Sequence, residues 1–206
     1  MVSVAIYENR AQKPRSMWDF PAIHQAWTLP VGSTADVVTY TNCQEVELLL
    51  NGQSLGKKGL ADYANRILDW KVPFAPGKLE AVGYNDGVEA ARFALQTPGI
   101  PASIRLTRTT QGESANGYDI AIFEAEVVDA QGVPCAALQQ HPMRFSLQGP
   151  GVLAGTSNGS VSYHGPFQSD TVPVYHGYAC IYVRSTHAPG TVQVTADLEG
   201  VTGSPP

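Results

Sequence analysis

Short runs of alternating apolar and polar residues, separated by turn-forming residues, dominate the chain. In the first half, such runs fall at residues 35–40, 46–50, 67–72, 78–84 and 88–96. In the second half they fall at residues 104–107, 119–128, 143–148, 151–154, 175–185 and 191–198. A period of two is typical of strands buried on one face, and turns spaced about 8 to 12 residues apart are typical of a β-sandwich.

Turn signals lie between these runs where hairpins need them. Asn51-Gly52 directly follows an apolar run, Pro76-Gly77 precedes the run at 78–84, and Asp86-Gly87 follows it. Asn-Gly and Asp-Gly accept the positive φ angles of a two-residue hairpin turn. No segment shows a sustained helical spacing of apolar residues with caps, so the sequence predicts almost no helix.

A Pro- and Gly-rich stretch at residues 97–102 divides the chain into halves of about 100 residues, the usual size of an immunoglobulin-like sandwich. The sequence therefore predicts an all-β fold with two immunoglobulin-like β-sandwich domains in tandem. The expected organisation is an irregular N-terminal arm at 1–34, a first sandwich at 35–97, a linker at 98–102 and a second sandwich at 103–206.

Composition excludes several partners. The 206 residues carry a formal net charge of −5, which disfavours binding to nucleic acid. No apolar run approaches the roughly 18 residues that span a bilayer, so no membrane partner is expected. Residues 1–10 lack a basic n-region, so they are not predicted to be a signal peptide, and the compartment stays open.

The three cysteines, Cys43, Cys135 and Cys180, are widely spaced and form no CxxC pair. This spacing does not suit a metal cluster. We expect small buried thiols. A disulfide between Cys135 and Cys180 is the alternative, because both lie in one half of the chain.

Two stretches of the first half resemble a known family. Residues 38–56 read VTYTNCQEVELLLNGQSLG, and residues 70–84 read WKVPFAPGKLEAVGY. Both resemble a module of bacterial glycoside hydrolase family 2 β-galactosidases that lies C-terminal to the catalytic barrel. Pieces of the second half, at 126–132, 145–151, 158–159 and 183–186, are similar to the Ig-like domain that follows this module. The resemblance covers about residues 20–200.

The resemblance implies a non-catalytic C-terminal accessory region of an enzyme that hydrolyses O-glycosidic bonds. In that family the acid/base and nucleophile glutamates belong to the upstream barrel, so no catalytic residue carries over and no cofactor is expected. The expected partner is the catalytic barrel of the parent enzyme. Two positions depart from the family pattern. Gln44 stands where the family usually has an acid, and residues 200–206 read GVTGSPP where a closing strand is expected, so either that strand is missing or the chain was cut.

Trp18 and Trp27 are the candidate sugar contacts, because aromatic rings stack on sugars and both lie in the predicted arm. The favoured alternative is that these rings anchor the arm by packing. A stand-alone carbohydrate-binding or adhesion module is therefore the second functional hypothesis. Trp70 has alternating strand neighbours and is expected in the core.

Residues 155–159, Gly-Thr-Ser-Asn-Gly, match the G-x-S-x-G motif of serine hydrolases, and Asp170, His176 and His187 follow in the order of a triad. An esterase built on Ser157 is the third hypothesis. The motif needs a helix directly after the serine, and the residues that follow are not helical, so we interpret it as a turn.

Glu124 and Glu126 lie two residues apart on one strand and share a face, whereas glycoside hydrolysis needs carboxyl groups on opposite sides of the sugar. With Asp129 they could bind Ca²⁺, but no loop offers the required series of oxygen ligands. The five histidines have no zinc-binding spacing. The sequence therefore predicts neither catalytic residues nor a metal site.

Overall fold

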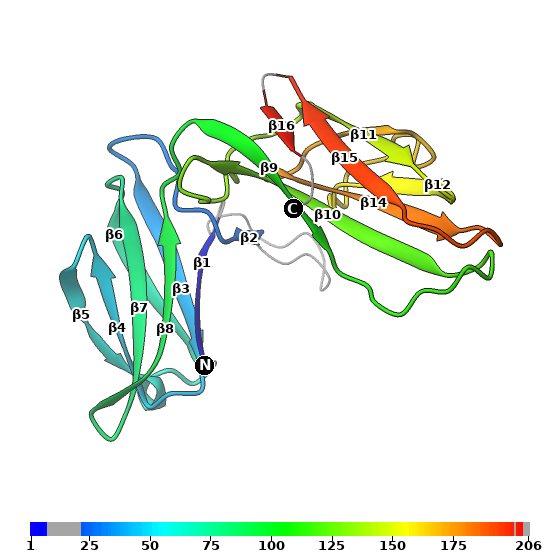
Figure 1. Cartoon of the computed structure of the whole chain (residues 1–206). Helices are drawn as coiled ribbons and strands as arrows, with labels where there is room; N and C mark the ends of the chain where they lie inside the picture. Colours follow the sequence, from blue (N-terminus) through cyan, green and yellow to red (C-terminus); the bar gives the residue numbers. More distant parts are fainter. Residues whose placement is uncertain (8–21, 200, 204–206) are drawn as a thin grey trace. The chain divides into compact units, whose positions relative to one another are not determined.

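The computed structural model describes residues 1–7, 22–199 and 201–203. The chain divides into two compact units, Met1–Thr97 and Pro98–Pro206, each with two four-stranded sheets (Figure 1). The helical content of the described residues is a single 3₁₀ turn, η1 (Leu60–Asp62). The predicted all-β fold is confirmed. Over the same residues, no helix has the length and apolarity needed to cross a bilayer.

The first unit contains the sheets β2-β1-β3-β6 and β5-β4-β7-β8, with antiparallel neighbours throughout. The strands of the first sheet are β1 (Val2–Tyr7), β2 (Ile23–His24), β3 (Thr34–Thr41) and β6 (Ile67–Pro73). Those of the second are β4 (Glu45–Leu50), β5 (Gln53–Gly59), β7 (Lys78–Asn85) and β8 (Val88–Gln96). This division is that of an immunoglobulin-like sandwich, in which strands A, B and E form one sheet and strands C, F and G the other. Here β1, β3 and β6 correspond to A, B and E, and β4, β7 and β8 correspond to C, F and G.

The core of the first unit lies between these two sheets. Val4, Val37 and Val72 enter it from the first sheet, and Leu48 and Leu79 enter it from the second. All five side chains are buried. Their positions follow the period of two along each strand, which is why the apolar alternation predicted these strands.

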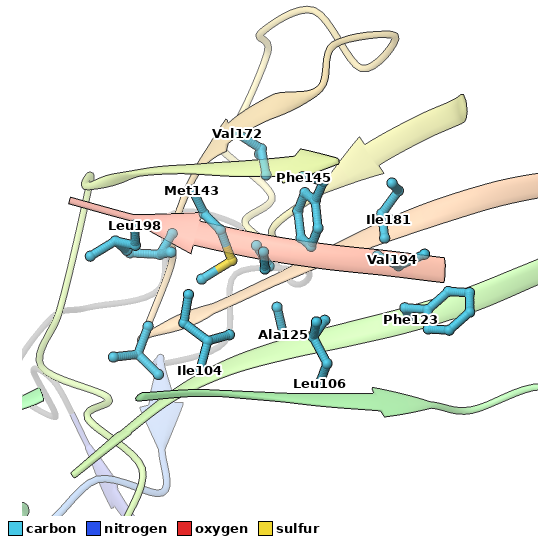
Figure 2. Packing of buried hydrophobic residues seen from close by; sticks show 14 of the residues in the cluster. Ile104, Leu106, Phe123, Ala125, Met143, Phe145, Val172, Ile181, Val194 and Leu198 are labelled. Carbon is cyan, nitrogen blue, oxygen red and sulfur yellow. The ribbon is translucent and has the colours of Figure 1, made fainter. Parts of the chain in front are cut away.

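The second unit has the same division. Its first sheet, β12-β14-β10-β9, contains β9 (Pro101–Arg108), β10 (Ile120–Asp129), β12 (Gly151–Ser157) and β14 (Tyr178–Ser185). Its second sheet, β13-β11-β15-β16, contains β11 (Pro142–Gln148), β13 (Thr171–Pro173), β15 (Gln193–Leu198) and β16 (Val201–Gly203). Figure 2 shows the core between them, with Phe123 and Ile181 of one sheet and Met143, Phe145 and Val194 of the other.

Two hairpin turns have the backbone that their sequences predict. Asn51 and Gly52, between β4 and β5, have φ angles of 53° and 81°. Asp86 and Gly87, between β7 and β8, have φ angles of 50° and 79°. Two successive positive φ angles define the type I′ turn, whose twist matches that of the flanking strands.

The boundaries of the units differ from the predicted ones at both ends. Residues 2–7, predicted as part of an irregular arm, form β1, which pairs with β3 from Val2–Thr41 to Ile6–Val37. The predicted linker at 98–102 already contains the start of β9 at Pro101. A closing strand, which we expected either to be missing or to have been cut off, is present as β16, which pairs with β15. The errors at the two ends arise because β1 and β16 are short strands that gain their stability from a partner strand rather than from a strong local pattern.

The outer face of the second sheet of the first unit carries a shielded carboxylate. The Glu80 side chain is 11% exposed, and its Oε1 lies 2.7 Å from Lys78 Nζ and 3.3 Å from an Arg92 guanidinium nitrogen. Hydrogen bonding from Lys78, aided by Arg92, holds the pKa of Glu80 below its usual range despite burial. The folded state therefore favours the ionised form of this carboxyl.

The strand at residues 2–7 should contribute to stability as a core element. Ile6 is fully buried and belongs to the first core, whereas Ile23 in β2 is 46% exposed. Ile6→Ala should lower the free energy of unfolding by about 2–5 kcal/mol. Ile23→Ala, the matched control, should lower it by less than about 1 kcal/mol. Urea unfolding followed by tryptophan fluorescence reports on this unit, since all three tryptophans lie before residue 98. If both substitutions lowered the free energy of unfolding by the same small amount, β1 would not be a core strand of the first unit.

Glu80 should make the first unit less stable in acid. Because its folded-state pKa is lowered, it stabilises the fold above the unfolded-state pKa of about 4.3, and this contribution is lost as the pH falls through the folded-state pKa. Glu80→Gln should cost about 1–2 kcal/mol at pH 7, a modest value because Lys78 and Arg92 are half-exposed. The difference from wild type should shrink between pH 5 and pH 2 in urea unfolding experiments. Glu45→Gln, at an exposed pair with Lys57, is the control and should show little dependence. A pH-independent deficit for Glu80→Gln would refute the argument.

Candidate functional site

Trp27 is a packing residue in the first unit. Its side chain is fully buried, its Nε1 donates a hydrogen bond to the Ala75 carbonyl oxygen at 3.0 Å, and its ring meets Phe74 edge-on at 5.1 Å. The Thr97 hydroxyl donates to the Trp27 carbonyl oxygen at 2.8 Å. The predicted sugar contact at Trp27 is therefore wrong, because no ring face is open to a ligand. Trp18 lies outside the described residues.

Trp70 and the three cysteines lie where the sequence predicted. Trp70 is 6% exposed and belongs to the core of the first unit. Cys43, Cys135 and Cys180 are buried free thiols. The alternative of a Cys135–Cys180 disulfide is therefore wrong, and burial raises the pKa of the Cys135 thiol.

The G-x-S-x-G stretch is not a catalytic elbow: Gly155, Thr156 and Ser157 end strand β12, and only Asn158 and Gly159 lie beyond the strand. Ser157 ends β12, and its Oγ accepts a hydrogen bond from the Gly159 amide at 3.3 Å. Asn158 is 2% exposed and donates to the Pro173 carbonyl oxygen at 2.8 Å. Residues 158–170, between β12 and β13, form turns, bends and irregular backbone, with no helix to present the serine. Asp170 binds Arg144 at 3.2 Å, in a surface ion pair. The motif therefore lacks the architecture of a serine hydrolase.

The carboxylates of β10 serve structural contacts. Glu126 pairs with Arg105 on the neighbouring strand. The Asp129 carboxylate accepts hydrogen bonds from the amides of Gly99, Gln131 and Val133, at 2.7–2.9 Å. These amides, Gly99 foremost, hold the pKa of Asp129 below its usual range. The part of the chain that the structure describes contains no group of three or more His, Cys, Asp or Glu residues able to hold a metal ion.

A pocket of about 320 Å³ opens at one end of the second unit. Three connections surround it: residues 109–119 between β9 and β10, Gly149-Pro150 between β11 and β12, and residues 186–192 between β14 and β15. Its volume is at the lower end of the range for small-molecule sites. Sequence reasoning missed this pocket, because its walls come from segments about 80 residues apart in the chain.

Family models match both units. Residues 32–91 match a model described as a domain of unknown function, DUF4982. Residues 104–205 match a model described as glycoside hydrolase family 2 C-terminal domain 5. This chain matches the C-terminal region of family 2 glycoside hydrolases. The family resemblance of residues 38–56 and 70–84 is confirmed by relatives of that kind across the whole chain.

The relatives are much longer proteins. A β-galactosidase of Bacteroides ovatus is 30% identical over 197 residues, which cover 95% of this chain and 22% of that protein. A β-glucuronidase of Formosa agariphila is 28% identical over 193 residues, which cover 90% of this chain and 19% of that protein. This chain thus spans about a fifth of the length of the curated relatives that it matches.

Solved structures agree with this family 2 assignment. A glycosyl hydrolase family 2 member from Bacteroides cellulosilyticus superposes with a TM-score of 0.84 at 30% identity, covering 97% of this chain and 27% of that one. A β-glycosidase from Bacteroides vulgatus superposes with a TM-score of 0.78 at 31% identity, covering 85% of this chain and 23% of that one. The tandem sandwiches therefore occur within larger family 2 enzymes.

Substitutions of Trp27 should lower the stability of the first unit and leave sugar binding unchanged. Trp27→Ala removes the ring from the core and should lower the free energy of unfolding by about 3–5 kcal/mol. Trp27→Phe keeps the contact with Phe74 but loses the hydrogen bond to Ala75, so its cost should be about 1–2 kcal/mol. Urea unfolding followed by the fluorescence of the two remaining tryptophans, Trp18 and Trp70, measures both. A neutral Trp27→Ala variant that had lost sugar binding would restore the sugar-contact hypothesis.

Proposed function

We propose that this chain is a non-catalytic accessory region of a β-galactosidase-like family 2 glycoside hydrolase and that it supports a catalytic barrel elsewhere in the same protein. The main support for this proposal is sequence similarity. Nearly the whole chain aligns with a segment that makes up about a fifth of the length of proteins named β-galactosidase and β-glucuronidase. The parent would hydrolyse an O-glycosidic bond, and this chain would contribute surface and stability.

The carboxylates of the second unit support a non-catalytic role. Glycoside hydrolysis needs an acid and a second carboxylate on opposite sides of the sugar, roughly 5–9.5 Å apart. Glu124 and Glu126 stand side by side on β10, and Glu126 is held by Arg105. Asp129 is bound by three backbone amides. None of these groups faces a second free carboxylate across a cleft among the described residues.

The outer face of the sheet β12-β14-β10-β9 supports contact with another part of a larger protein. Ile181 and Val183 of β14 enter the core, so Tyr178 and Tyr182 point to the opposite face of the sheet. Ile122 of β10 lies on that same face, directly opposite Tyr182 in the register. Sheet faces that meet water are usually polar. The apolar part of this outer face, Ile122, Tyr178 and Tyr182, which lies beside the Arg105–Glu126 ion pair, is our candidate surface for the catalytic region.

The alternative, a stand-alone carbohydrate-binding or adhesion module, drew on Trp18 and Trp27. Burial of Trp27 removes one of these two residues from any binding surface. The accessory role needs no ligand at either tryptophan, and it agrees with the length of the relatives. It is therefore the function that the geometry supports better.

The proposal predicts that the isolated chain is inactive and that the whole protein is active. The purified chain should not hydrolyse chromogenic β-galactosides or β-glucuronides, whereas the protein encoded by the complete reading frame should hydrolyse one of them. The double variant Glu124→Gln, Glu126→Gln in the whole protein should keep its kcat, because these side chains are not catalytic. Turnover by the isolated chain, lost when the same two substitutions are made in that chain, would contradict the proposal.

The supporting role has a separate readout. Deleting this region from the whole protein should lower the Tm of the remainder by more than about 2 °C, since a lost interface of about 1 kcal/mol has that effect in a domain of ordinary size. Ile122→Glu, on the candidate contact surface, should reproduce part of the loss. Glu45→Gln, on an exposed pair of the first unit, is the control. Unchanged Tm and kcat/KM after deletion would exclude a supporting role.

A further inference from the structure

The connections around the pocket of the second unit hold one another in place. The Asn116 side-chain oxygen accepts hydrogen bonds from the amides of Tyr118 and Asp119, both at 2.9 Å, and from the Ser185 hydroxyl at 3.2 Å. The Thr186 hydroxyl donates to the Pro150 carbonyl oxygen at 2.9 Å. The loop at 109–119 is thus fastened to the end of β14, and the pocket is formed before any ligand arrives.

Gly149 lets two of these connections approach closely. Its φ angle is +95°, and a Cβ atom at this position would lie 2.2 Å from the Thr191 carbonyl oxygen. Only glycine avoids both the strained backbone and the clash. The close approach of residues 149–150 to residues 191–192 therefore requires this glycine, and it holds Pro150, Thr191 and Val192, which line the pocket, next to one another. A preformed site spends less of its binding free energy on ordering loops.

The pocket has an apolar floor and a polar wall. Phe123 and Val183 belong to the core and also line the pocket, so its floor is the open end of that core. Arg108, Glu113 and Asp119 supply charged groups around it. A sugar ring presents the same two characters, apolar C–H groups on its faces and hydroxyl groups at its edge. Carboxylates accept hydrogen bonds from those hydroxyls, and a guanidinium donates to them.

The charges of the pocket discriminate between classes of sugar. Arg108 is already paired with Glu113, whose side chain is 12% exposed. Asp119 adds a further negative charge, because hydrogen bonds from Asn116 and from the Ser114 amide keep its pKa below the usual range. Arg108, Glu113 and Asp119 together therefore carry a net charge of about −1. An anionic ligand such as a uronate would meet the repelling Asp119 carboxylate and a guanidinium whose charge Glu113 already compensates, although N–H donors of Arg108 remain for uncharged hydroxyls.

We propose that this pocket binds a neutral saccharide unit and excludes uronates. The choice of a sugar as the ligand rests on the proposed function, whereas the choice of a neutral sugar rests on the charges of the pocket. The site would hold a carbohydrate on the accessory region, away from any catalytic carboxylates. Sugar binding can fail while the accessory role stands, since the two have separate readouts.

The test titrates the whole 206-residue chain with methyl β-D-galactopyranoside, lactose and D-glucuronate, by two-dimensional NMR and calorimetry. The expected result is saturable binding of a neutral sugar, with a Kd on the order of 1 mM because one ring offers few contacts. Chemical shift changes should centre on residues 108–123 and 183–192. D-glucuronate should bind at least tenfold more weakly.

A variant pair of the same chemistry tests the charge argument. Glu113→Gln frees Arg108 inside the pocket, so it should weaken the neutral sugar about tenfold and bring D-glucuronate binding within threefold of it. Glu126→Gln breaks the Arg105–Glu126 ion pair, which lies outside the pocket, and should leave all affinities unchanged. Ala115→Trp, at an exposed residue of the pocket, blocks the space without removing a charge and should abolish binding.

Each other outcome overturns the proposal. Absence of saturable binding by both neutral sugars in the folded wild-type chain removes the site. Binding that survives Glu113→Gln and Ala115→Trp, with both variants folded by circular dichroism, places the sugar elsewhere. D-glucuronate affinity equal to or above that of the neutral sugars refutes the selection by charge. Hydrolysis by the whole protein bears on none of these results, so the proposed function is judged separately.

Discussion

Each unit of this chain is held together by the burial of one face of a sheet against one face of its partner sheet. In the first unit, Val37 of β3 and Leu48 of β4 are fully buried in one core, and their strand neighbours point the other way. A slip of one residue in any pairing would turn every inward side chain outward. Burial therefore fixes the register, and the register in turn fixes where the connections between strands lie.

This constraint explains which strands the sequence could predict. Strands with a strong apolar alternation and a glycine turn, such as β7 and β8, needed no tertiary information. β5 (Gln53–Gly59) contains two lysines and two glycines and lies at a sheet edge with most side chains exposed, so it has no apolar face to reveal it. β1 is apolar, but its pairing partner β3 lies about 35 residues further on, beyond the prolines that made the segment look irregular. Partner choice is a property of the fold, and local sequence does not encode it.

The candidate sites show the same limit. The sequence rightly indicated that no helix follows Ser157, because the missing helix is a local feature, but the interpretation of residues 155–159 as a turn was wrong for the first three, which end strand β12. It could not decide between packing and sugar contact for Trp27, because that depends on Phe74 and Ala75, almost 50 residues away. The pocket was invisible for the same reason: Arg108, Phe123 and Val192 come together only after both sheets have formed.

Two ion pairs of identical chemistry show how position decides what a charge can do. Arg105–Glu126 joins two neighbouring strands on a face where both side chains are at least a third exposed, so water screens the pair and its effect is small. Arg108–Glu113 joins the end of β9 to a loop, and Glu113 is largely shielded. Because Glu113 compensates the charge of Arg108, the carboxylate of Asp119 makes the net charge of the pocket negative. The sandwich thus supplies a rigid frame, whereas ligand preference is decided by three or four side chains at one end of it. A change of specificity needs no change in either sheet.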